Sequence, residues 1–294
     1  MKIALYGQSY RENFSACVIE LLHALEHYDM EVIIEENYLR TIRAEAPQVK
    51  RYPTFQAYED LDHTYDLFFS IGGDGTILRT VTYVRDLGIP VIGINTGRLG
   101  FLATVQQDEV AQAVNAIVNK AYTIVPRSLL QATVTPRTAE LEEINVALNE
   151  IAVSRKNTTS MITIPTYLNN EYLTSYWADG LIISTPTGST GYSLSCGGPV
   201  MAPDTNSLVL TPIAPHNLNA RPLVVSDDTV IRLKVSGRED EYLVSLDSRV
   251  ITISNEAEVT VRRAPFSINM VSLDSESFLK TLRKKLLWGE DRRN

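Results

Sequence analysis

The sequence predicts an α/β domain built on a mostly parallel sheet, followed by a second, β-rich domain. Strand and helix patterns alternate up to about residue 120, whereas short β-branched strands follow from about Tyr122. The length of 294 residues exceeds that of most single domains. We therefore place an α/β domain at residues 1–121 and a β-rich domain at 122–274, with a helix over 275–290 that packs back on the first domain.

The first domain shows a regular succession of elements. Apolar residues between Phe14 and Leu25 step by three and four, as on one face of a helix. The predicted elements are the strand 3–6, the helix 12–28, the strands 31–35 and 67–71, the helix 77–87, the strand 90–94 and the helix 108–119. This alternation predicts crossover connections, a parallel sheet and ligand-binding loops at the carboxyl ends of its strands. The polar residues 40–63 show no apolar period, which indicates a flexible loop or lid.

The second domain consists of short strands with turns between them. The candidate strands are 132–135, 146–154, 162–168, 172–177, 181–184, 207–210, 229–235, 242–246, 250–253, 259–263 and 267–271. Asn169-Asn170 between two alternating runs predicts a hairpin turn. Residues 277–288 return to a helical pattern, with basic residues between the apolar ones.

Composition excludes several classes of function. Hydrophobic residues make up 44% and charged residues 21% of the chain, which is ordinary for a globular protein. The net charge of −8 argues against a nucleic-acid partner that is held by phosphate neutralisation. The two cysteines, Cys17 and Cys196, lie far apart and form no metal-binding pattern, as expected in a reducing compartment.

The beginning of the chain, Met1–Gly7, has the pattern of a strand and lacks the features of a signal peptide. No apolar run approaches the roughly 18–20 residues that cross a bilayer. We therefore expect a cytoplasmic protein with no membrane partner.

The most informative motif follows the predicted strand 67–71. Gly72, Gly73 and Gly75 leave backbone N–H groups open to a phosphate, and the helix that follows adds the positive end of its dipole. Asp74 would repel phosphate, so its presence indicates a general base or a partner of a bridging metal ion. A tight turn that uses Asp and Gly for their backbone preferences is the alternative, but the strand before and the helix after favour a phosphate site.

Two basic residues and one polar loop accompany this motif. Arg79 lies one turn into the predicted helix and is equally consistent with a phosphate contact and with a solvated helix face. The run from Asn95 to Leu102 follows the next strand and should border the same edge of the sheet. Within it Arg98 is a phosphate contact or a surface ion pair. The sequence contains neither the Gly-x-Gly-x-x-Gly fingerprint of dinucleotide-binding folds nor a P-loop.

A second cluster runs from Asp179 to Ser195, where a strand leads into a turn rich in hydroxyl groups and glycines. Six Ser or Thr residues and two glycines between Ser184 and Ser193 indicate donors for phosphate or ribose oxygens. A β-turn with a helix cap is the simpler alternative, although a cap needs only one hydroxyl. Asn149 and Glu150 form a polar pair in an apolar strand pattern, and they either face a ligand or lie at a solvated strand edge.

Together, these motifs resemble the NAD kinase family over most of the chain. Gly-Gly-Asp-Gly-Thr also occurs in lipid kinases, whereas the Thr-Pro-Thr-Gly-Ser-Thr run with the other motifs in this order is far more specific. The matching segments are Gly72–Thr76, Asn95–Phe101, Asn149-Glu150, Asp179-Gly180, Ser184–Ser195, Gly197–Pro199, Pro212–His216 and Arg221–Leu223.

The resemblance implies an enzyme that transfers the γ-phosphate of ATP to the 2′-hydroxyl of the adenosine ribose of NAD, producing NADP and ADP. It implies a divalent metal, Mg²⁺, and a homodimer or homotetramer. Asp74 matches the family's catalytic base, Asn149 and Glu150 match the pair that holds the adenosine, and Asp179 matches the carboxylate near the nicotinamide. The other substrate-binding residues that we expect are Gly72, Gly73, Gly75, Thr76, Arg79, Thr187, Thr190, Gly191, Tyr192, Ser193, Leu194, Ser195, Ala214 and Arg249.

The sequence departs from the family pattern at two places. Gly191 stands where many relatives carry alanine, and Asp247-Ser248-Arg249 replaces a commoner Asp-Gly-Gln. The second departure puts in doubt a contact near the NAD ribose, unless Arg249 makes it differently.

Two other functions fit parts of the sequence. A lipid kinase shares the glycine motif, but the acidic chain has no basic amphipathic patch for a membrane. A non-catalytic dinucleotide sensor would use the same pocket, but the intact Asp74 argues for catalysis. The sequence leaves open the use of NADH, the use of polyphosphate in place of ATP, and regulation.

Overall fold

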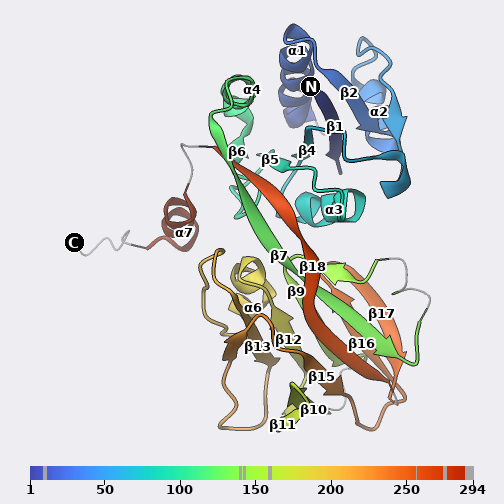
Figure 1. Cartoon of the computed structure of the whole chain (residues 1–294), viewed down its shortest axis with the longest axis vertical. Helices are drawn as coiled ribbons and strands as arrows, with labels where there is room; N and C mark the ends of the chain where they lie inside the picture. The colour runs from blue at the N-terminus through green and yellow to red at the C-terminus, as the bar shows by residue number, and fades with distance from the viewer. Residues whose placement is uncertain are drawn as a thin grey trace. The chain divides into compact units, whose positions relative to one another are not determined.

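The computed structural model describes residues 1–8, 12–138, 141, 144–157, 161–255, 257–273 and 277–288. The chain forms two compact units (Figure 1). Unit 1 comprises Met1–Pro126 with Ile268–Asn294, and unit 2 comprises Arg127–Ser267. The unit boundaries fall within two long strands, β7 (Tyr122–Thr135) and β18 (Glu258–Leu273). No helix in the described part of the chain is long and apolar enough to span a membrane.

Unit 1 is an α/β domain with a parallel sheet in the order β3-β2-β1-β4-β5, so the predicted fold class is confirmed here. Its strands are β1 (Lys2–Gly7), β2 (Glu31–Glu35), β3 (Thr54–Phe55), β4 (Leu67–Ile71), β5 (Val91–Asn95) and β6 (Val105–Gln106). Its helices are α1 (Glu12–His27), α2 (Glu36–Glu45), α3 (Asp74–Val84), α4 (Val110–Val118) and α7 (Phe278–Leu286), with short 3₁₀ turns at Tyr58–Asp60 and Gln107–Glu109.

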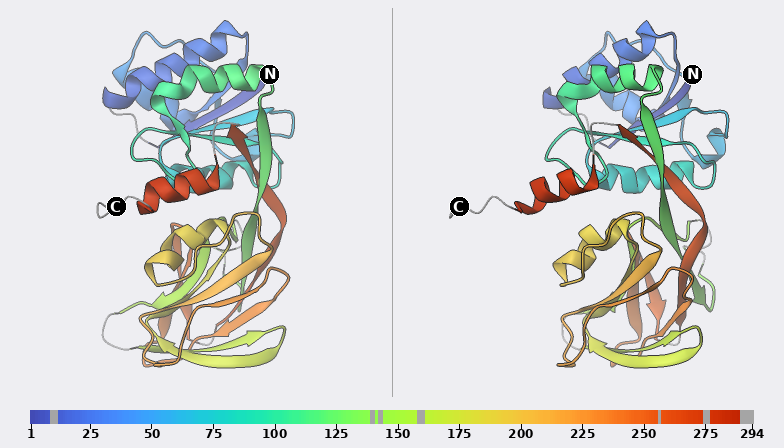
Figure 2. Two further views of the ribbon diagram at one scale, coloured as in Figure 1. Left: turned by 90° about the vertical axis from the view of Figure 1, so that its left-hand side faces the viewer. Right: turned by 60° about the vertical axis from the view of Figure 1, so that its left-hand side comes forward.

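Helices cover both faces of this sheet. Figure 2 shows α1 and α4 on one face and α3 on the other. Val18 and Leu21 of α1 pack with Val114 of α4 against the strands, in the core of the first face. On the second face Tyr83 of α3 packs against Phe68 of β4. Because both faces are covered, β4 and β5 are buried along their whole length, as is typical of parallel strands.

The prediction of a flexible loop or lid at 40–63 is wrong for its first part and for Thr54–Phe55. Helix α2 occupies its first part, and Leu39, Ile42 and Ala46 are buried at helical spacing. Phe55 in β3 is also buried and contacts Phe68 edge-on at 5.8 Å between ring centroids. These side chains therefore belong to the core of unit 1, and the apolar period was missed because charged residues separate its members.

Unit 2 is built of antiparallel strands, in agreement with the predicted β-rich domain. One sheet has the order β14-β13-β12-β9-β16-β17. The other strands of this unit pair in the order β11-β10-β15-β18. The strands are β8 (Val146–Ala147), β9 (Glu150–Arg155), β10 (Ile162–Leu168), β11 (Glu171–Ala178), β12 (Gly180–Ser184), β13 (Ser207–Ile213), β14 (Leu223–Ser226), β15 (Ile231–Lys234), β16 (Glu241–Leu246) and β17 (Arg249–Ser254).

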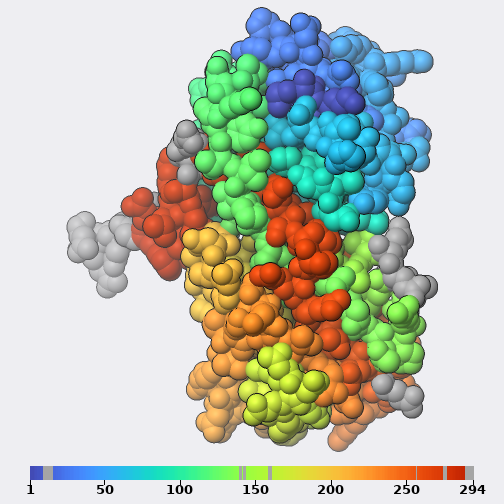
Figure 3. Space-filling model, in the orientation of Figure 1, coloured from blue at the N-terminus to red at the C-terminus, as the bar shows by residue number. Residues whose placement is uncertain are grey.

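The Asn169-Asn170 hairpin is confirmed. Both residues have positive φ, 49° and 70°, and Leu168 pairs with Glu171 across the turn. The hairpin that they close lies at the surface of unit 2 (Figure 3, yellow-green). Three predicted strands differ from the structure. The strands predicted at 259–263 and 267–271 form the single strand β18, and the one predicted at 146–154 is interrupted at Leu148-Asn149.

Candidate active site

The glycine loop of unit 1 connects the buried strand β4 to α3. Gly72 has φ of 150°, and a Cβ there would lie 2.1 Å from Thr76 Oγ1, so the turn requires glycine. Gly73 is the N-cap residue of α3 and gives the helix no side-chain cap. The first turn of α3 therefore presents its backbone amides without competition from a capping side chain.

Gly73 and Gly75 have no packing reason to be glycine. A Cβ at either position would meet no atom within 4 Å, and neither residue has positive φ. A glycine inside a helix costs about 1 kcal/mol relative to alanine, so Gly75 weakens α3 without a gain in packing. Open space beside bare amides is the property that a closely approaching phosphate needs.

The carboxylate of Asp74 is held by three consecutive backbone amides. Oδ2 accepts the N–H of Phe101 at 2.8 Å, and Oδ1 accepts the N–H groups of Leu102 and Ala103, each at 3.0 Å. A carboxylate offers about four acceptor positions, so one remains on Oδ2. Asp74 is thus fixed in orientation and retains one place to accept a proton or a donor from a substrate.

The loop that supplies these amides is itself ordered by local contacts. Asn95 is buried, accepts the N–H of Gly97 at 2.8 Å and donates to the carbonyl of Arg98 at 2.7 Å. A Cβ at Gly100 would lie 1.9 Å from Asp74 Oδ1, so only glycine lets the loop approach the carboxylate this closely. The sequence prediction placed this loop near the glycine motif, and the hydrogen bonds from residues 101–103 join the two within unit 1.

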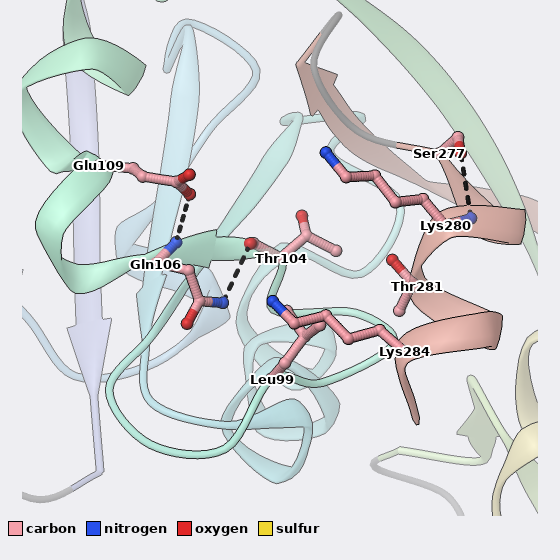
Figure 4. Close-up of a pocket in the computed structure, with 8 residues that line it drawn as sticks. All are labelled: Leu99, Thr104, Gln106, Glu109, Ser277, Lys280, Thr281 and Lys284. Carbon is pink, nitrogen blue, oxygen red and sulfur yellow. Dashed lines mark hydrogen bonds between the residues drawn. The ribbon is translucent and has the colours of Figure 1, made fainter. Parts of the chain in front are cut away.

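Helix α7 packs beside the same loop. The rings of Phe101 and Phe278 lie 6.5 Å apart, and Lys285 Nζ lies 5.6 Å from the centre of the Phe101 ring. A cavity of about 110 Å³ separates α7 from the segment 99–106 (Figure 4), and the side chains of Lys280 and Lys284 extend from the helix toward that segment. Glu109 also lines this cavity, so its lining carries both signs of charge.

Thr76 and Arg79 of α3 differ in their surroundings. Thr76 is buried, and its side chain packs under Gly72, which accounts for its presence in the turn. Arg79 is exposed, and its guanidinium interacts with the Tyr6 hydroxyl at the carboxyl end of β1. Burial raises the pKa of Tyr6, and the hydrogen bond with Arg79 partly opposes that rise. Arg79 is therefore anchored at the edge of the sheet where the glycine loop also lies.

Asn149 and Glu150 lie in unit 2 at the point where β9 begins. The N–H groups of Leu148, Asn149 and Glu150 all donate to the carboxylate of Asp247, at 2.8 to 3.1 Å. One carboxylate oxygen of Glu150, Oε2, is buried and has no hydrogen-bond partner among the described residues. Burial, followed by the charge of Asp247, raises the pKa of Glu150 to about 7, and the N–H of Tyr192 opposes this rise.

The hydroxyl-rich turn lies against this pair, but most of its hydroxyls are used within the protein. Ser184 and Thr185 donate to the carbonyls of Asn149 and Leu148, Ser189 donates to that of Pro186, and Thr190 to that of Thr187. Ser193 is buried and shares a hydrogen bond of 2.8 Å with Thr211. The expectation of a dense surface of donors for a ligand is therefore corrected, because these hydroxyls stabilise the turn.

The turn nevertheless brings its glycines against the polar pair. A Cβ at Gly188 would lie 2.1 Å from the Asn149 carbonyl oxygen, and one at Gly191 would lie 3.3 Å from Glu150 Oε2. Gly191 precedes the short helix α6 (Tyr192–Ser195), in which Tyr192 and Ser195 are exposed and Leu194 is half-buried. The structure thus brings the predicted residues from Thr187 to Ser195 next to Asn149 and Glu150.

Asp179 immediately precedes β12, and Ala214 immediately follows β13, the neighbouring strand of the same sheet. The Asp179 N–H donates to the carbonyl of Ile213 at 2.9 Å, and Ala214 follows with positive φ of 43°. The Asp179 carboxylate forms an ion pair of 2.9 Å with Arg155, and both side chains keep about a quarter of their surface exposed. Asp179 is therefore accessible to a ligand on its remaining acceptor positions.

Arg249 does not stand free for a ligand. Its guanidinium donates to the carbonyl of Ile144 at 2.8 Å and to that of Val146. These bonds tie the start of β17 to the segment before β9. Arg249, at the position where the family more commonly has Gln, thus stabilises the backbone of unit 2 through these two hydrogen bonds.

Sequence reasoning missed the residues that hold the polar side chains in place. Asp247 and Gly100 were noted only as parts of motifs, and the amides of 101–103 carry no sequence signal of their own. A carboxylate in a hairpin turn is ordinary on sequence grounds, and only the fold reveals that Asp247 faces three amides.

The described residues contain no cluster of three or more His, Cys, Asp or Glu side chains that could hold a metal ion by themselves. Mg²⁺ commonly takes one or two carboxylates and completes its shell with phosphates and water. The described residues therefore do not fit a closed protein cage for the ion, and they fit an ion that is held mainly by a polyphosphate and water.

Comparison with known proteins covers the whole chain. Family models of the ATP-NAD kinase N-terminal domain and of the ATP-NAD kinase C-terminal domain match residues 15–122 and 148–273. The chain is 58% identical over 294 residues to the NAD kinase of Christiangramia forsetii and 55% identical over 294 residues to that of Flavobacterium psychrophilum, with 100% of both chains covered in each case.

Solved structures with the same fold include two from distant organisms. Yeast NADH kinase complexed with NADH has a TM-score of 0.88 at 22% identity, covering 100% of this chain and 89% of that chain. An NAD kinase from Archaeoglobus fulgidus in complex with ATP has a TM-score of 0.75 at 25% identity, covering 98% of this chain and 99% of that chain.

Proposed function

This chain belongs to the NAD kinase family, and on that premise we propose that it transfers the γ-phosphate of ATP to the 2′-hydroxyl of the adenosine ribose of NAD, producing NADP and ADP. The observation that carries the proposal is the glycine loop with Asp74 at the start of α3. The loop offers bare amides and open space for phosphates, and it places one oriented carboxylate beside them. Phosphoryl transfer depends mainly on such positioning and electrostatic stabilisation.

In the proposed reaction Asp74 is the general base. Its Oδ2 takes the proton of the 2′-hydroxyl while the ribose oxygen forms a bond to the γ-phosphorus, and the bond from that phosphorus to the β,γ-bridging oxygen breaks to release ADP. The amides of Gly73 and Gly75 hold phosphate oxygens, and Arg79 adds a positive charge at the same edge of the sheet. The amide of Gly72, which was also expected to be open, instead donates to the carbonyl of Ile94 at 2.9 Å. The three amides from the loop at 101–103 keep the carboxylate in one orientation through the reaction.

The unpartnered Oε2 of Glu150 supports a role for Asn149 and Glu150 in binding the adenosine of NAD. A buried acceptor without a donor costs about 1–3 kcal/mol, and a ribose hydroxyl or an adenine amino group would satisfy it. Asp179 contributes an accessible carboxylate for the nicotinamide end. The residues proposed to line the adenine side are Thr187, Thr190, Gly191, Tyr192, Leu194, Ser195 and Ala214. Ser193 was expected among them but is not proposed, because its side chain is buried and bonded to Thr211. Arg249 acts in this scheme through the backbone that it holds.

We also propose Mg²⁺ as the divalent metal, a homodimer or homotetramer, and a cytoplasmic location. When bound, Mg²⁺ would neutralise charge on the ATP phosphates, and these phosphates and water would supply most of its ligands. The acidic chain offers no charge pattern for nucleic acid. Light scattering of the purified protein at micromolar concentration distinguishes a monomer from either oligomer.

The test is to incubate the purified protein with ATP, MgCl₂ and NAD and to follow NADP with an NADP-specific dehydrogenase. Steady formation of NADP and equimolar ADP supports the proposal. Absence of NADP, with NAD binding intact by calorimetry, would favour a dinucleotide sensor. Phosphorylation of diacylglycerol in vesicles, with none of NAD, would favour a lipid kinase.

A further inference from the structure

Asp247 lies in the turn between β16 and β17 and is linked in both directions to the Asn149-Glu150 pair. Its Oδ1 accepts the N–H groups of Asn149 at 2.8 Å and Glu150 at 3.1 Å, and its Oδ2 accepts that of Leu148 at 2.9 Å. In return the N–H of Asp247 donates to the carbonyl of Glu150 at 3.0 Å. The hydrogen bonds of this link are part-buried, so they are partly shielded from solvent.

The register of the sheet explains why a carboxylate is needed at this point. Strand β9 pairs with β16 as far as Ile151 and Leu246, where β16 ends. Asp247 then turns away with positive φ of 52°, which Asp tolerates better than most residues. The amides of 148–150 would lose their backbone acceptors here, and the Asp247 side chain supplies acceptors in their place.

The opposite side of the pair is fixed as well. The Asn149 carbonyl accepts the N–H of Thr185 at 2.9 Å and the hydroxyl of Ser184 at 3.2 Å. Gly188 packs so closely on this carbonyl that a side chain would overlap it. The backbone of Asn149 is therefore held from both sides, and its side chain and that of Glu150 remain available to a ligand.

We infer that Asp247 is a positioning residue for NAD binding, which holds Asn149 and Glu150 in the orientation that receives the adenosine. This inference rests on the proposed function, in which that pair contacts the substrate. Asp247 itself touches no substrate and acts through the backbone of the pair. Preorganised contacts of this kind improve affinity because the substrate does not have to order them.

Asp247 also influences the charge state of Glu150. The ionisable groups that face Glu150 are Asp247 from the β16–β17 turn, and Tyr192 and Cys196 from α6 and its end; Arg249 from β17 faces Asp247. The negative charge of Asp247 opposes ionisation of Glu150. Removal of that charge should therefore let Glu150 ionise at lower pH, an effect that a purely structural residue would not produce.

The test compares Asp247→Asn and Asp247→Glu with the control Asp240→Asn, which removes a charge from an exposed aspartate of the same unit. For Asp247→Asn we expect KM for NAD to rise about 10- to 100-fold, with kcat and KM for ATP within about three-fold of wild type. The pH at which NAD affinity reaches half its plateau, measured by calorimetry, should fall. Asp247→Glu keeps the charge but misplaces the oxygens, so KM should rise while that pH stays unchanged.

Several results would overturn the inference. One is a wild-type KM for NAD in both variants while Glu150→Ala raises it. Another is loss of folding in both variants, which would make Asp247 a requirement of the fold and not a positioning residue. The NAD-binding measurement needs no turnover. If the wild-type protein binds NAD but forms no NADP, the proposed function is refuted, and the NAD affinities of the Asp247 variants still test this inference.

Discussion

Glu150 provides a prediction whose size follows from the structure. Burial and the charge of Asp247 raise its pKa from the ordinary value of 4.5 to about 7. Each pKa unit corresponds to about 1.4 kcal/mol, so the ionised carboxylate makes the folded state less stable by about 3 kcal/mol at pH 8. We expect Glu150→Gln, which cannot ionise, to remove this cost.

The sign of the pH dependence follows from proton binding. Above pH 4.5 the unfolded chain releases the Glu150 proton, whereas the folded protein keeps it up to about pH 7. The folded state then binds more protons, so the free energy of unfolding falls as pH rises between these values. The stability gain of Glu150→Gln over wild type should therefore be about 2 to 3 kcal/mol larger at pH 8 than at pH 5.

The assay is urea unfolding at pH 5 and pH 8, read from tryptophan fluorescence. The chain has two tryptophans, and Trp288→Phe in both proteins leaves Trp177 to report on unit 2 alone. Glu171→Gln, at an exposed site of unit 2, is the matched control and should show no pH-dependent difference. If the free energies of unfolding of wild type and Glu150→Gln differ by the same amount at both pH values, Glu150 does not keep its proton in the folded protein up to about pH 7, and the reasoning is wrong.

Three further predictions concern both units. Gly100→Ala puts a Cβ within 1.9 Å of Asp74 Oδ1, so kcat should fall about 100-fold with KM for NAD unchanged. A wild-type kcat would show that the close contact between Gly100 and Asp74 does not matter for catalysis. Glu150→Ala should mainly raise KM for NAD in steady-state assays, and a loss confined to kcat would contradict adenosine binding. Ile42→Ala should lower the free energy of unfolding by about 2–5 kcal/mol, because Ile42 of α2 is buried in the core. An unchanged urea midpoint would instead support the flexible loop that the sequence predicts at 40–63.

Patterns with a local cause were predictable from the sequence. The alternation of strands and helices gave the parallel sheet of unit 1, and Asn169-Asn170 gave the hairpin, because each depends on residues close in the chain. The glycine loop was predicted for the same reason. Helix α2 was missed because Leu39, Ile42 and Ala46 are few and lie among charged residues, and only tertiary packing shows that they are buried.

The parts of the site that depend on distant residues were not predictable. Nothing near Asp74 in the sequence indicates that amides 27 to 29 residues away bind its carboxylate. The link from Asp247 to Asn149 spans 98 residues, and it exists because β9 and β16 are neighbours in the sheet. The hydroxyls of the turn after β12 looked like ligand donors because their backbone partners become visible only in the fold.

The central claim is that Asp74 accepts the proton of the 2′-hydroxyl. The most direct measurement is the rate of NADP formation by Asp74→Asn at saturating ATP, Mg²⁺ and NAD, with NAD affinity measured on the same protein. Asparagine can keep its oxygen toward Leu102 and Ala103, but it cannot take the proton. We predict that turnover falls by about two to four orders of magnitude while NAD still binds. Wild-type turnover in a folded Asp74→Asn protein would contradict the claim.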